Sequence, residues 1–168
     1  MRRSLILLVC LFSLLSSLSA QKMTEGSLAP LKKGGKTKVI LDFSDASIHG
    51  MTVEDFAVYE QDWEIDKPII ISKFMLGLGE KCPSIRFGTE LDGEITLLVK
   101  VLSINTKGDY ACEAIIMNSQ EEKIAHITDL NAKGGTFGSK LNLIKDGAEH
   151  TGKSLGKFLK RTIDKLSK

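Results

Sequence analysis

The sequence predicts a two-layer α/β (α+β) sandwich, in which a mixed, mainly antiparallel sheet of four or five strands carries helices on one face. Two observations favour this fold class. Apolar residues alternate through three successive segments between residues 94 and 130, a pattern typical of a β-meander. The last segment, residues 140–166, places its apolar residues at helical spacing instead, which predicts a long amphipathic C-terminal helix across the sheet.

The first twenty residues have the features of a secretory signal peptide. Arg2 and Arg3 precede an apolar run from Leu5 to Leu15, and small residues follow up to Ala20. The run is shorter than the roughly 20 residues that a membrane-spanning helix needs. Ala20 suits signal peptidase, and cleavage after Ser19 is the alternative. We therefore expect a mature chain that is periplasmic or secreted.

Neither a lipid nor a transmembrane helix is expected to anchor the mature chain. Cys10 lies behind Val9 in the middle of the apolar run, whereas a lipid-accepting cysteine closes such a run behind a small residue. Residues 21–36 contain Gly, Ser, Pro and Lys without periodicity, which predicts a flexible tether. A single globular domain, residues 37–168, follows the tether.

The first half of this domain contains one clear strand and one clear helix. Lys38–Ser44 alternates as a strand does. Thr52 is a good N-cap for a helix that extends to Trp63, because acidic residues fill the first turn. Pro68 suits the start of another helix, but the isoleucines after it favour a strand. We predict a strand over Ile69–Ser72, leading to a short helix that ends near Gly79.

The second half is more regular. Three antiparallel strands are predicted, at Glu94–Asn105, Tyr110–Asn118 and Lys123–Leu130, joined by residues of turn type. A glycine-rich turn, Gly134–Ser139, then leads to the C-terminal helix, with Phe137 expected to anchor the turn in the core. The apolar stripe of that helix consists of Leu141, Ile144, Ala148, Leu155, Phe158, Leu159 and Ile163.

Charge argues against nucleic acid as a partner. The full chain has 23 basic and 21 acidic residues, for a formal net charge of +2. Because Arg2 and Arg3 leave with the signal peptide, the mature chain is close to neutral. Only its last sixteen residues are strongly basic, whereas a nucleic-acid-binding domain carries a net positive face.

Two cysteines, Cys82 and Cys112, remain after cleavage, in a compartment that permits disulfides. A bridge between them would close a loop of about thirty residues and stabilise the fold by roughly 3–4 kcal/mol. The alternative is two separately buried thiols that behave as small apolar side chains. The sequence has no second pair of cysteines that would indicate a disulfide framework.

Residues 147–154 read GAEHTGKS and match the phosphate-binding loop pattern. In that interpretation Gly147 and Gly152 allow backbone N–H groups to surround a phosphate, while Lys153 and Ser154 contact phosphate and magnesium. The context argues against it, because only fourteen residues follow Ser154 and no later strand can supply an aspartate for the metal. The alternative is a glycine notch at Gly152 and Gly156 that lets the backbone of the helix approach the sheet closely.

The remaining polar candidates have structural explanations. Gly134–Gly138 could form an anion-binding nest, or simply the turn from sheet to helix.

The histidines lack the short spacing of a metal pair: they are His49, His126 and His150. Four carboxylates gather after the first strand, where capping and solvation are expected rather than calcium binding or acid–base chemistry: they are Asp42, Asp45, Glu54 and Asp55. No catalytic set is recognisable, so we expect no catalytic residue, cofactor or metal.

Tyr59 and Trp63 lie four residues apart on the first predicted helix, away from the Val53 and Phe56 side of that helix. This spacing leaves two alternatives. Either the helix has a second buried face, or the two aromatic side chains form an exposed patch that marks a partner surface.

The order of elements resembles that of small bacterial envelope domains. The resemblance rests on the KVILDFS strand from Lys38, the helix capped by Thr52, the meander turn at Asn105–Asp109 and the glycine-containing final helix. The families concerned are the periplasmic domain of the curli-secretion lipoprotein, the N-terminal domain of TolB, and a set of uncharacterised secreted relatives. The resemblance covers about residues 37–163 and transfers no functional residue. It implies a non-enzymatic role in envelope assembly, with another envelope protein as the partner.

Three hypotheses about function follow. The leading one is a non-catalytic secreted or periplasmic protein that acts as an interaction or assembly module. The second is a phosphate- or nucleotide-binding enzyme that uses Gly147–Ser154. The third is a periplasmic protein that binds a small ligand between helix and sheet.

Overall fold

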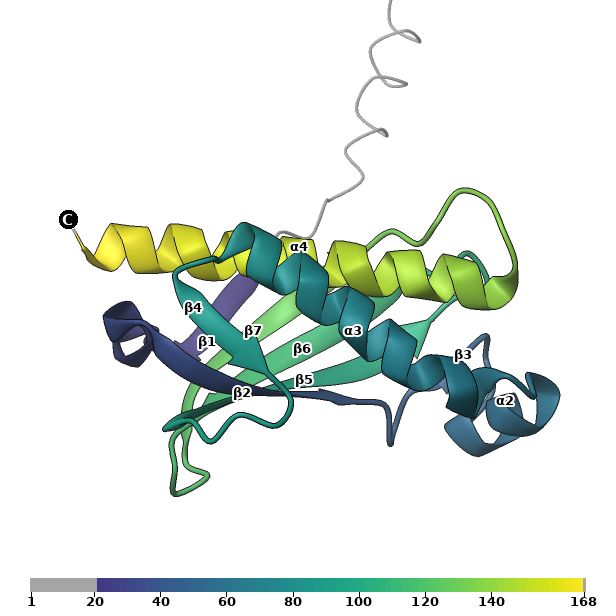
Figure 1. The fold of residues 1–168 in the computed structure, drawn as a ribbon, viewed down its shortest axis with the longest axis horizontal. Helices are drawn as coiled ribbons and strands as arrows, with labels where there is room; N and C mark the ends of the chain where they lie inside the picture. Colours follow the sequence, from purple (N-terminus) through teal and green to yellow (C-terminus); the bar gives the residue numbers. More distant parts are fainter. Residues whose placement is uncertain (1–20, 168) are drawn as a thin grey trace, which may run out of the picture.

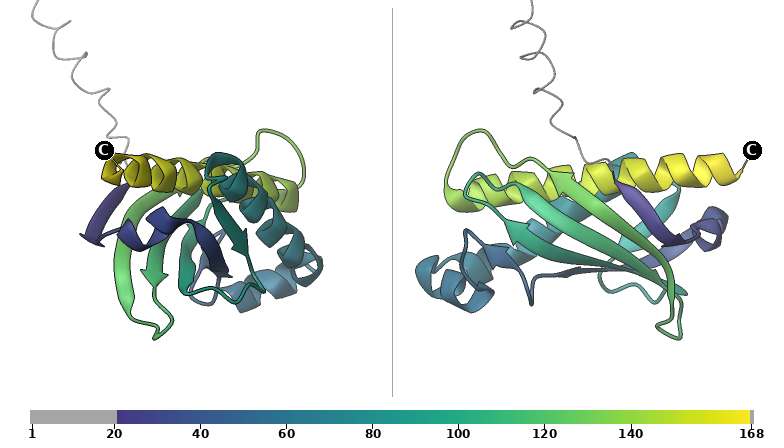
Figure 2. Two further views of the ribbon diagram at one scale, coloured as in Figure 1. Left: turned by 60° about the vertical axis from the view of Figure 1, so that its left-hand side comes forward. Right: turned by 180° about the vertical axis from the view of Figure 1, so that it is seen from behind.

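In the computed structural model, which describes residues 21–167, an open mixed sheet is covered on one face by two long helices (Figures 1 and 2). The predicted fold class is confirmed. The elements run in the order β1 (Lys22–Gly26), the 3-10 helix η1 (Ala29–Lys33), β2 (Gly35–Asp42), β3 (Ser47–Ile48), α2 (Val53–Tyr59), α3 (Trp63–Lys81), β4 (Ile85–Gly88), β5 (Ile95–Ile104), β6 (Tyr110–Met117), β7 (Lys123–Ala132) and α4 (Lys140–Leu166).

The sheet has the strand order β1-β7-β6-β5-β2-β4. β2 pairs with β5 from Ile95 to Lys100, and β3 pairs with the end of β5 at Ser103 and Ile104. The meander β5-β6-β7 is antiparallel, as predicted. Every second residue of β5 faces the helices and is buried, as at Leu97, Val99 and Val101, while Leu98 and Leu102 face the uncovered side. Three of the pairings are parallel and three antiparallel, and the antiparallel ladders are together the longer, so the sheet is mixed and mainly antiparallel, as predicted.

The long C-terminal helix has the predicted bounds. Its N-cap is Ser139, whose Oγ accepts a hydrogen bond from the N–H of Asn142. The predicted apolar stripe faces the core, with Phe158 only partly buried at its edge. α3 crosses α4 on the same face of the sheet (Figure 1). The two helices form one layer, and their crossing fixes the position of α3.

Small residues allow this crossing. A Cβ on Gly152 would lie 2.1 Å from the carbonyl oxygen of Phe74, and a Cβ on Gly77 would lie 2.2 Å from the carbonyl oxygen of Glu149. Both distances are far inside van der Waals contact, so the backbones of α3 and α4 touch directly here. Gly156 makes a similar approach to Leu78. Gly152 and Gly156 therefore do form a packing notch, but the prediction that it faces the sheet is wrong, because the backbone that they approach is that of α3.

The prediction of a flexible tether over residues 21–36 is wrong. β1 pairs antiparallel with β7 at the edge of the sheet, and β2 begins at Gly35. Leu28 and Leu31 around η1 are buried in the core. Residues 22–26 have little intrinsic strand preference, but pairing with β7 supplies partners for their backbone groups. With β1, β3 and β4 the sheet reaches seven strands, more than the four or five expected.

The strand predicted at Ile69–Ser72 is also wrong, because these residues belong to α3. Helical spacing buries Ile70, Phe74 and Leu78 completely, and this burial outweighs the strand preference of the isoleucines. The preceding helix ends at Tyr59 rather than at Trp63, which begins α3. Its predicted cap is confirmed: Thr52 Oγ1 accepts the N–H of Asp55 at 3.1 Å.

Among the helices of residues 21–167, none is both long enough and apolar enough to cross a bilayer. The predicted signal peptide, residues 1–20, lies outside the described residues.

Candidate interaction site

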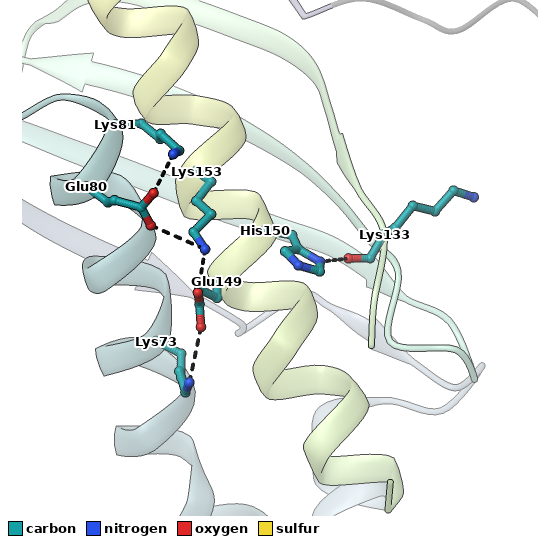
Figure 3. Close-up of polar contacts among 7 residues, drawn as sticks. All are labelled: Lys73, Glu80, Lys81, Lys133, Glu149, His150 and Lys153. Carbon is teal, nitrogen blue, oxygen red and sulfur yellow. Dashed lines mark hydrogen bonds and ion pairs between the residues drawn. The ribbon is translucent and has the colours of Figure 1, made fainter. Parts of the chain in front are cut away.

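The Gly147–Ser154 motif does not form a phosphate-binding loop, because it lies in the middle of α4. Its backbone N–H groups point along the helix to carbonyl groups one turn earlier and cannot surround a phosphate. Lys153 is already paired, with its Nζ 2.7 Å from Glu149 Oε1 and 3.2 Å from Glu80 on α3 (Figure 3). Lys73 contacts the other carboxylate oxygen of Glu149 at 3.1 Å. The motif is therefore part of the α3–α4 contact.

The same ion pairs shift the titration of the groups that form them. Hydrogen bonds from Lys153 and Lys73 hold the pKa of Glu149 below its ordinary value. Conversely, the carboxylates of Glu149 and Glu80 raise the pKa of Lys153. Glu149 and Lys153 therefore stay charged at neutral pH. The row of ion pairs that Figure 3 shows between α3 and α4 is thus present at that pH.

The turn Gly134–Gly138 does not offer an open anion-binding nest. The N–H of Gly134 donates to Asp109 Oδ1 at 2.8 Å, and the N–H of Gly135 donates to the carbonyl of Leu143 at 3.2 Å. The turn is thus held by the side chain of Asp109 and the backbone of α4, without an apolar anchor from its own side chains. Phe137 is accordingly 86% exposed, and its prediction as a core residue is wrong.

Of the two alternatives for Cys82 and Cys112, the structure shows two separately buried free thiols and no disulfide between them. Cys82 follows the end of α3, whereas Cys112 lies in the middle of β6. Burial raises the pKa of Cys112 to about 12 and also raises the pKa of Cys82. Neither thiol is therefore suited to nucleophilic chemistry at neutral pH.

The histidines have structural contacts. His126 Nε2 lies 3.0 Å from Glu113 on the uncovered face of the sheet. His150 Nδ1 donates to the carbonyl of Lys133 at 2.8 Å (Figure 3). His49 stacks edge-on against Phe56, and burial lowers its pKa. Within residues 21–167, no group of three or more His, Cys, Asp and Glu side chains is arranged to hold a metal ion.

The carboxylates after the first strand serve as caps, as predicted. Asp42 Oδ1 accepts the N–H of Ser44 at 2.9 Å, and this bond lowers the pKa of Asp42. Glu54 and Asp55 occupy the first turn of α2, where the helix dipole favours negative charge.

Trp63 and Tyr59 have different environments. Trp63 is completely buried, with its ring edge-on to Phe43 and Phe56 at centroid distances of 5.5 and 5.3 Å. Tyr59 is 54% exposed, and Lys140 Nζ lies 4.2 Å from the centre of its ring. Of the two alternatives, burial therefore holds for Trp63, while Tyr59 remains at the surface, so the two side chains form no joint exposed patch.

A different exposed surface occurs on α3. Ile65, Ile69 and Leu76 follow one another at helical spacing on its outer side and are 70%, 45% and 59% exposed. The opposite side of the same helix is the buried one, with Ile70 and Phe74 in the core. Large aliphatic side chains thus lie on two sides of α3, although its buried side alone supplies the contacts with the core. We call Ile65, Ile69 and Leu76 the α3 stripe.

A groove adjoins the α3 stripe. β4 pairs with β2 only from Gly35 to Lys38, so the last part of β2 has β5 on one side and, among residues 21–167, no strand on the other. This unpaired edge, from Ile40 to Phe43, lines a hollow of about 480 Å³ together with side chains of α2 and α3. A second hollow of about 640 Å³ shares Glu64 and Lys67 with the first and continues along α3. We call the two hollows together the β2 groove.

The two ends of the molecule carry opposite charge. No lysine or arginine occurs between Lys38 and Lys67. The acidic residues of that segment are Asp42, Asp45, Glu54, Asp55, Glu60, Asp62, Glu64 and Asp66. Lys145 pairs with Asp66 at 2.6 Å, Lys67 with Glu64 at 3.7 Å, and Lys140 lies over Tyr59. The remaining carboxylates of α2 and the first turn of α3 leave this surface acidic, and we call it the acidic end.

The opposite end is formed by η1 and the last three turns of α4, where six exposed basic residues meet one acidic residue, Asp164. These basic residues are Lys32, Lys33, Lys157, Lys160, Arg161 and Lys165. We call this surface the basic end. Figure 1 shows that α2 and the C-terminus of α4 lie at opposite ends of the long axis.

Sequence reasoning missed the α3 stripe because it assigned Ile69–Ser72 to a strand. Had residues 63–81 been taken as one helix, Ile65, Ile69 and Leu76 would have fallen opposite Ile70 and Phe74. The unpaired edge of β2 could not be predicted from the sequence, because it depends on how far β4 extends along β2.

Comparisons with known proteins identify no family for this chain: no family model matches it, and neither does any curated protein. Among solved structures it is similar to a PelC dodecamer from Paraburkholderia phytofirmans, at 13% identity and a TM-score of 0.44, over 82% of this chain and 97% of that chain. A variant PelC dodecamer from the same organism gives 13% identity and a TM-score of 0.43, over 83% and 97% of the two chains. The resemblance to envelope domains stays a prediction.

Proposed function

We propose that this protein is a non-catalytic interaction and assembly module of the periplasm or the extracellular space, and that it binds a protein partner through the α3 stripe and the β2 groove. The observation that supports this proposal most strongly is the α3 stripe. Its three large aliphatic side chains are exposed on one side of a helix whose other side is buried in the core. Exposed apolar side chains gathered on one side of a helix, here with Ser72 between Ile69 and Leu76, are typical of interaction sites.

The stripe alone does not supply enough free energy for a stable complex. Full burial of an aliphatic side chain is worth about 1.5–3 kcal/mol, and these three are already about half covered. Covering the remainder yields roughly 1 kcal/mol each, or about 3 kcal/mol in total. Further contacts are needed to offset the cost of association.

The β2 groove can provide such contacts. Backbone donors and acceptors along the unpaired edge of β2 can pair with an extended segment of the partner, which is the strand-addition mode of recognition. The side of the groove carries apolar atoms from Val53 and Ala57, and farther along α3 from Ile71 and Met75. Backbone pairing would supply affinity, and the hollows would select side chains.

The test is site-specific photo-cross-linking in the native host. A photoreactive amino acid at Ile69 is expected to give a discrete adduct with a partner protein. The same amino acid at Glu121, an exposed residue of the β6–β7 turn, is the matched control and is expected to give none. Substituting Leu76→Glu should abolish the Ile69 adduct, because it places a charge in the apolar contact without disturbing the core. The absence of an adduct at Ile69, or equal adducts at both positions, contradicts the proposal.

A further inference from the structure

We propose that the partner of the α3 stripe is a second copy of this chain, whose basic end covers the stripe and the acidic end beside it. This inference rests on the proposed function, because it names the partner of the α3 stripe; the basic end is helical and adds no strand to β2, so the β2 groove stays free in this contact. Charge complementarity identifies the occupant: the stripe begins within the acidic end, and the same molecule carries a matching basic surface elsewhere.

The receiving surface combines apolar and acidic side chains. Ile65 lies between the exposed carboxylates of Asp62 and Glu64 and the rest of the stripe. On α2, Asp55 is exposed and Val58 is 81% exposed. A partner therefore has to offer positive charge and aliphatic contact together. Lysine and arginine meet both requirements, because their aliphatic stems cover apolar surface while their charged groups reach carboxylates.

The basic end offers such side chains in a fixed arrangement. Lys157, Arg161 and Lys165 follow one another every four residues on the exposed side of α4. η1 is attached to the end of the same helix, where Lys32 Nζ donates to the carbonyl of Leu166 at 3.1 Å. Lys160 is paired with Asp164 at 2.7 Å and contributes less. The surface is thus a rigid helix face rather than a tail.

One molecule cannot make this contact with itself, because the two surfaces lie at opposite ends of its long axis (Figure 1). The contact between copies is therefore heterologous: the basic end of one copy meets the acidic end of the next. Contacts of this kind continue from copy to copy and produce closed rings or open filaments rather than a twofold dimer.

The experiment measures the mass of the purified protein in solution as a function of salt. At low ionic strength and about 100 µM protein, we expect a weight-average mass above that of two copies. In about 0.5 M NaCl, where charges are screened beyond a few ångströms, the mass should fall to that of the monomer.

Charge reversal then tests which surfaces meet. The first variant is Asp55→Lys with Asp62→Lys, and the second is Lys157→Glu with Arg161→Glu. Each alone should be monomeric at low salt, because like charges now face each other. A one-to-one mixture should regain the wild-type mass, since every contact in it pairs opposite charges. This rescue also shows that both variants are folded. The matched control is Glu121→Lys with Glu122→Lys in the β6–β7 turn, which should assemble as the wild type does.

Four results would overturn the inference. They are a wild-type protein that is monomeric at every salt concentration, a mixture that does not regain mass, assembly that stops at two copies, and binding of the basic end to vesicles of anionic lipid without self-association. If self-association fails while the Ile69 cross-link joins this chain to a different protein, the proposed function stands and only this inference falls.

Discussion

Replacing Gly152 by alanine tests whether this glycine serves the crossing of α3 and α4. In an exposed helix the change would stabilise by about 1 kcal/mol, because alanine is the better helix former. Here the new Cβ would lie 2.1 Å from the carbonyl oxygen of Phe74 and 2.9 Å from the backbone nitrogen of Leu78. Both neighbours are backbone atoms of a packed helix, so the two helices have to move apart. Overpacking of this kind costs about 3 kcal/mol at the upper part of its usual range, which leaves a net loss of about 2 kcal/mol.

The assay is urea unfolding at equilibrium. With a slope of about 2 kcal/mol per molar urea, the midpoint should fall by about 1 M. The matched control is Gly79→Ala on α3, where a Cβ would meet no heavy atom within 4 Å. This control should raise the midpoint, because it gains helix propensity without a clash. If Gly152→Ala raised the midpoint as Gly79→Ala does, the close approach of the two helices would be refuted.

Three further predictions concern buried and paired groups. Tyr110 is buried, and its hydroxyl has no hydrogen-bond partner among residues 21–167. Tyr110→Phe should therefore leave the urea midpoint of unfolding unchanged or stabilise the protein by up to about 1 kcal/mol. A clear loss of stability would contradict this prediction. Because Cys82 and Cys112 are free and buried, a thiol reagent should modify them only after unfolding, and a fall in melting temperature on adding a reductant would instead reveal a disulfide. The pKa of Glu149 is lowered from 4.5 in the folded state, so its contribution is complete above that unfolded-state value and is lost as pH falls through the lower folded value. Glu149→Gln should therefore destabilise at about pH 7, and its difference from the wild type should shrink as the pH falls below 4.5 through the folded pKa; a difference that does not shrink in acid would contradict the ion pairs.

The parts of the fold with strong periodicity could be predicted from the sequence. Alternation through β5, β6 and β7 has no helical alternative, and α4 keeps one apolar stripe over its whole length. These patterns are local, and burial in the folded chain reinforces them. The N-cap at Thr52 was predictable for the same reason, because its hydrogen bond reaches only three residues along the chain.

The errors arose where distant contacts decide the structure. Residues 22–26 form a strand because β7 offers them an edge, and Ile70 lies in a helix because α4 and the sheet enclose that side of α3. The candidate site depends on these same elements. The α3 stripe exists only if α3 is a helix, and the β2 groove exists only because β4 ends at Gly88. Neither the helical state of α3 nor the end of β4 at Gly88 can be predicted from a local sequence pattern.

The central claim is that a partner covers the α3 stripe in the cell. The measurement is the rate at which a thiol reagent modifies Ile69→Cys in intact cells of the native host, compared with the purified protein diluted in high salt. Glu121→Cys serves as the control, and Cys82 and Cys112 do not interfere because both are buried. We predict that position 69 is protected in cells and reactive when purified, while position 121 reacts in both. Equal reactivity of position 69 in cells and in solution would contradict the account.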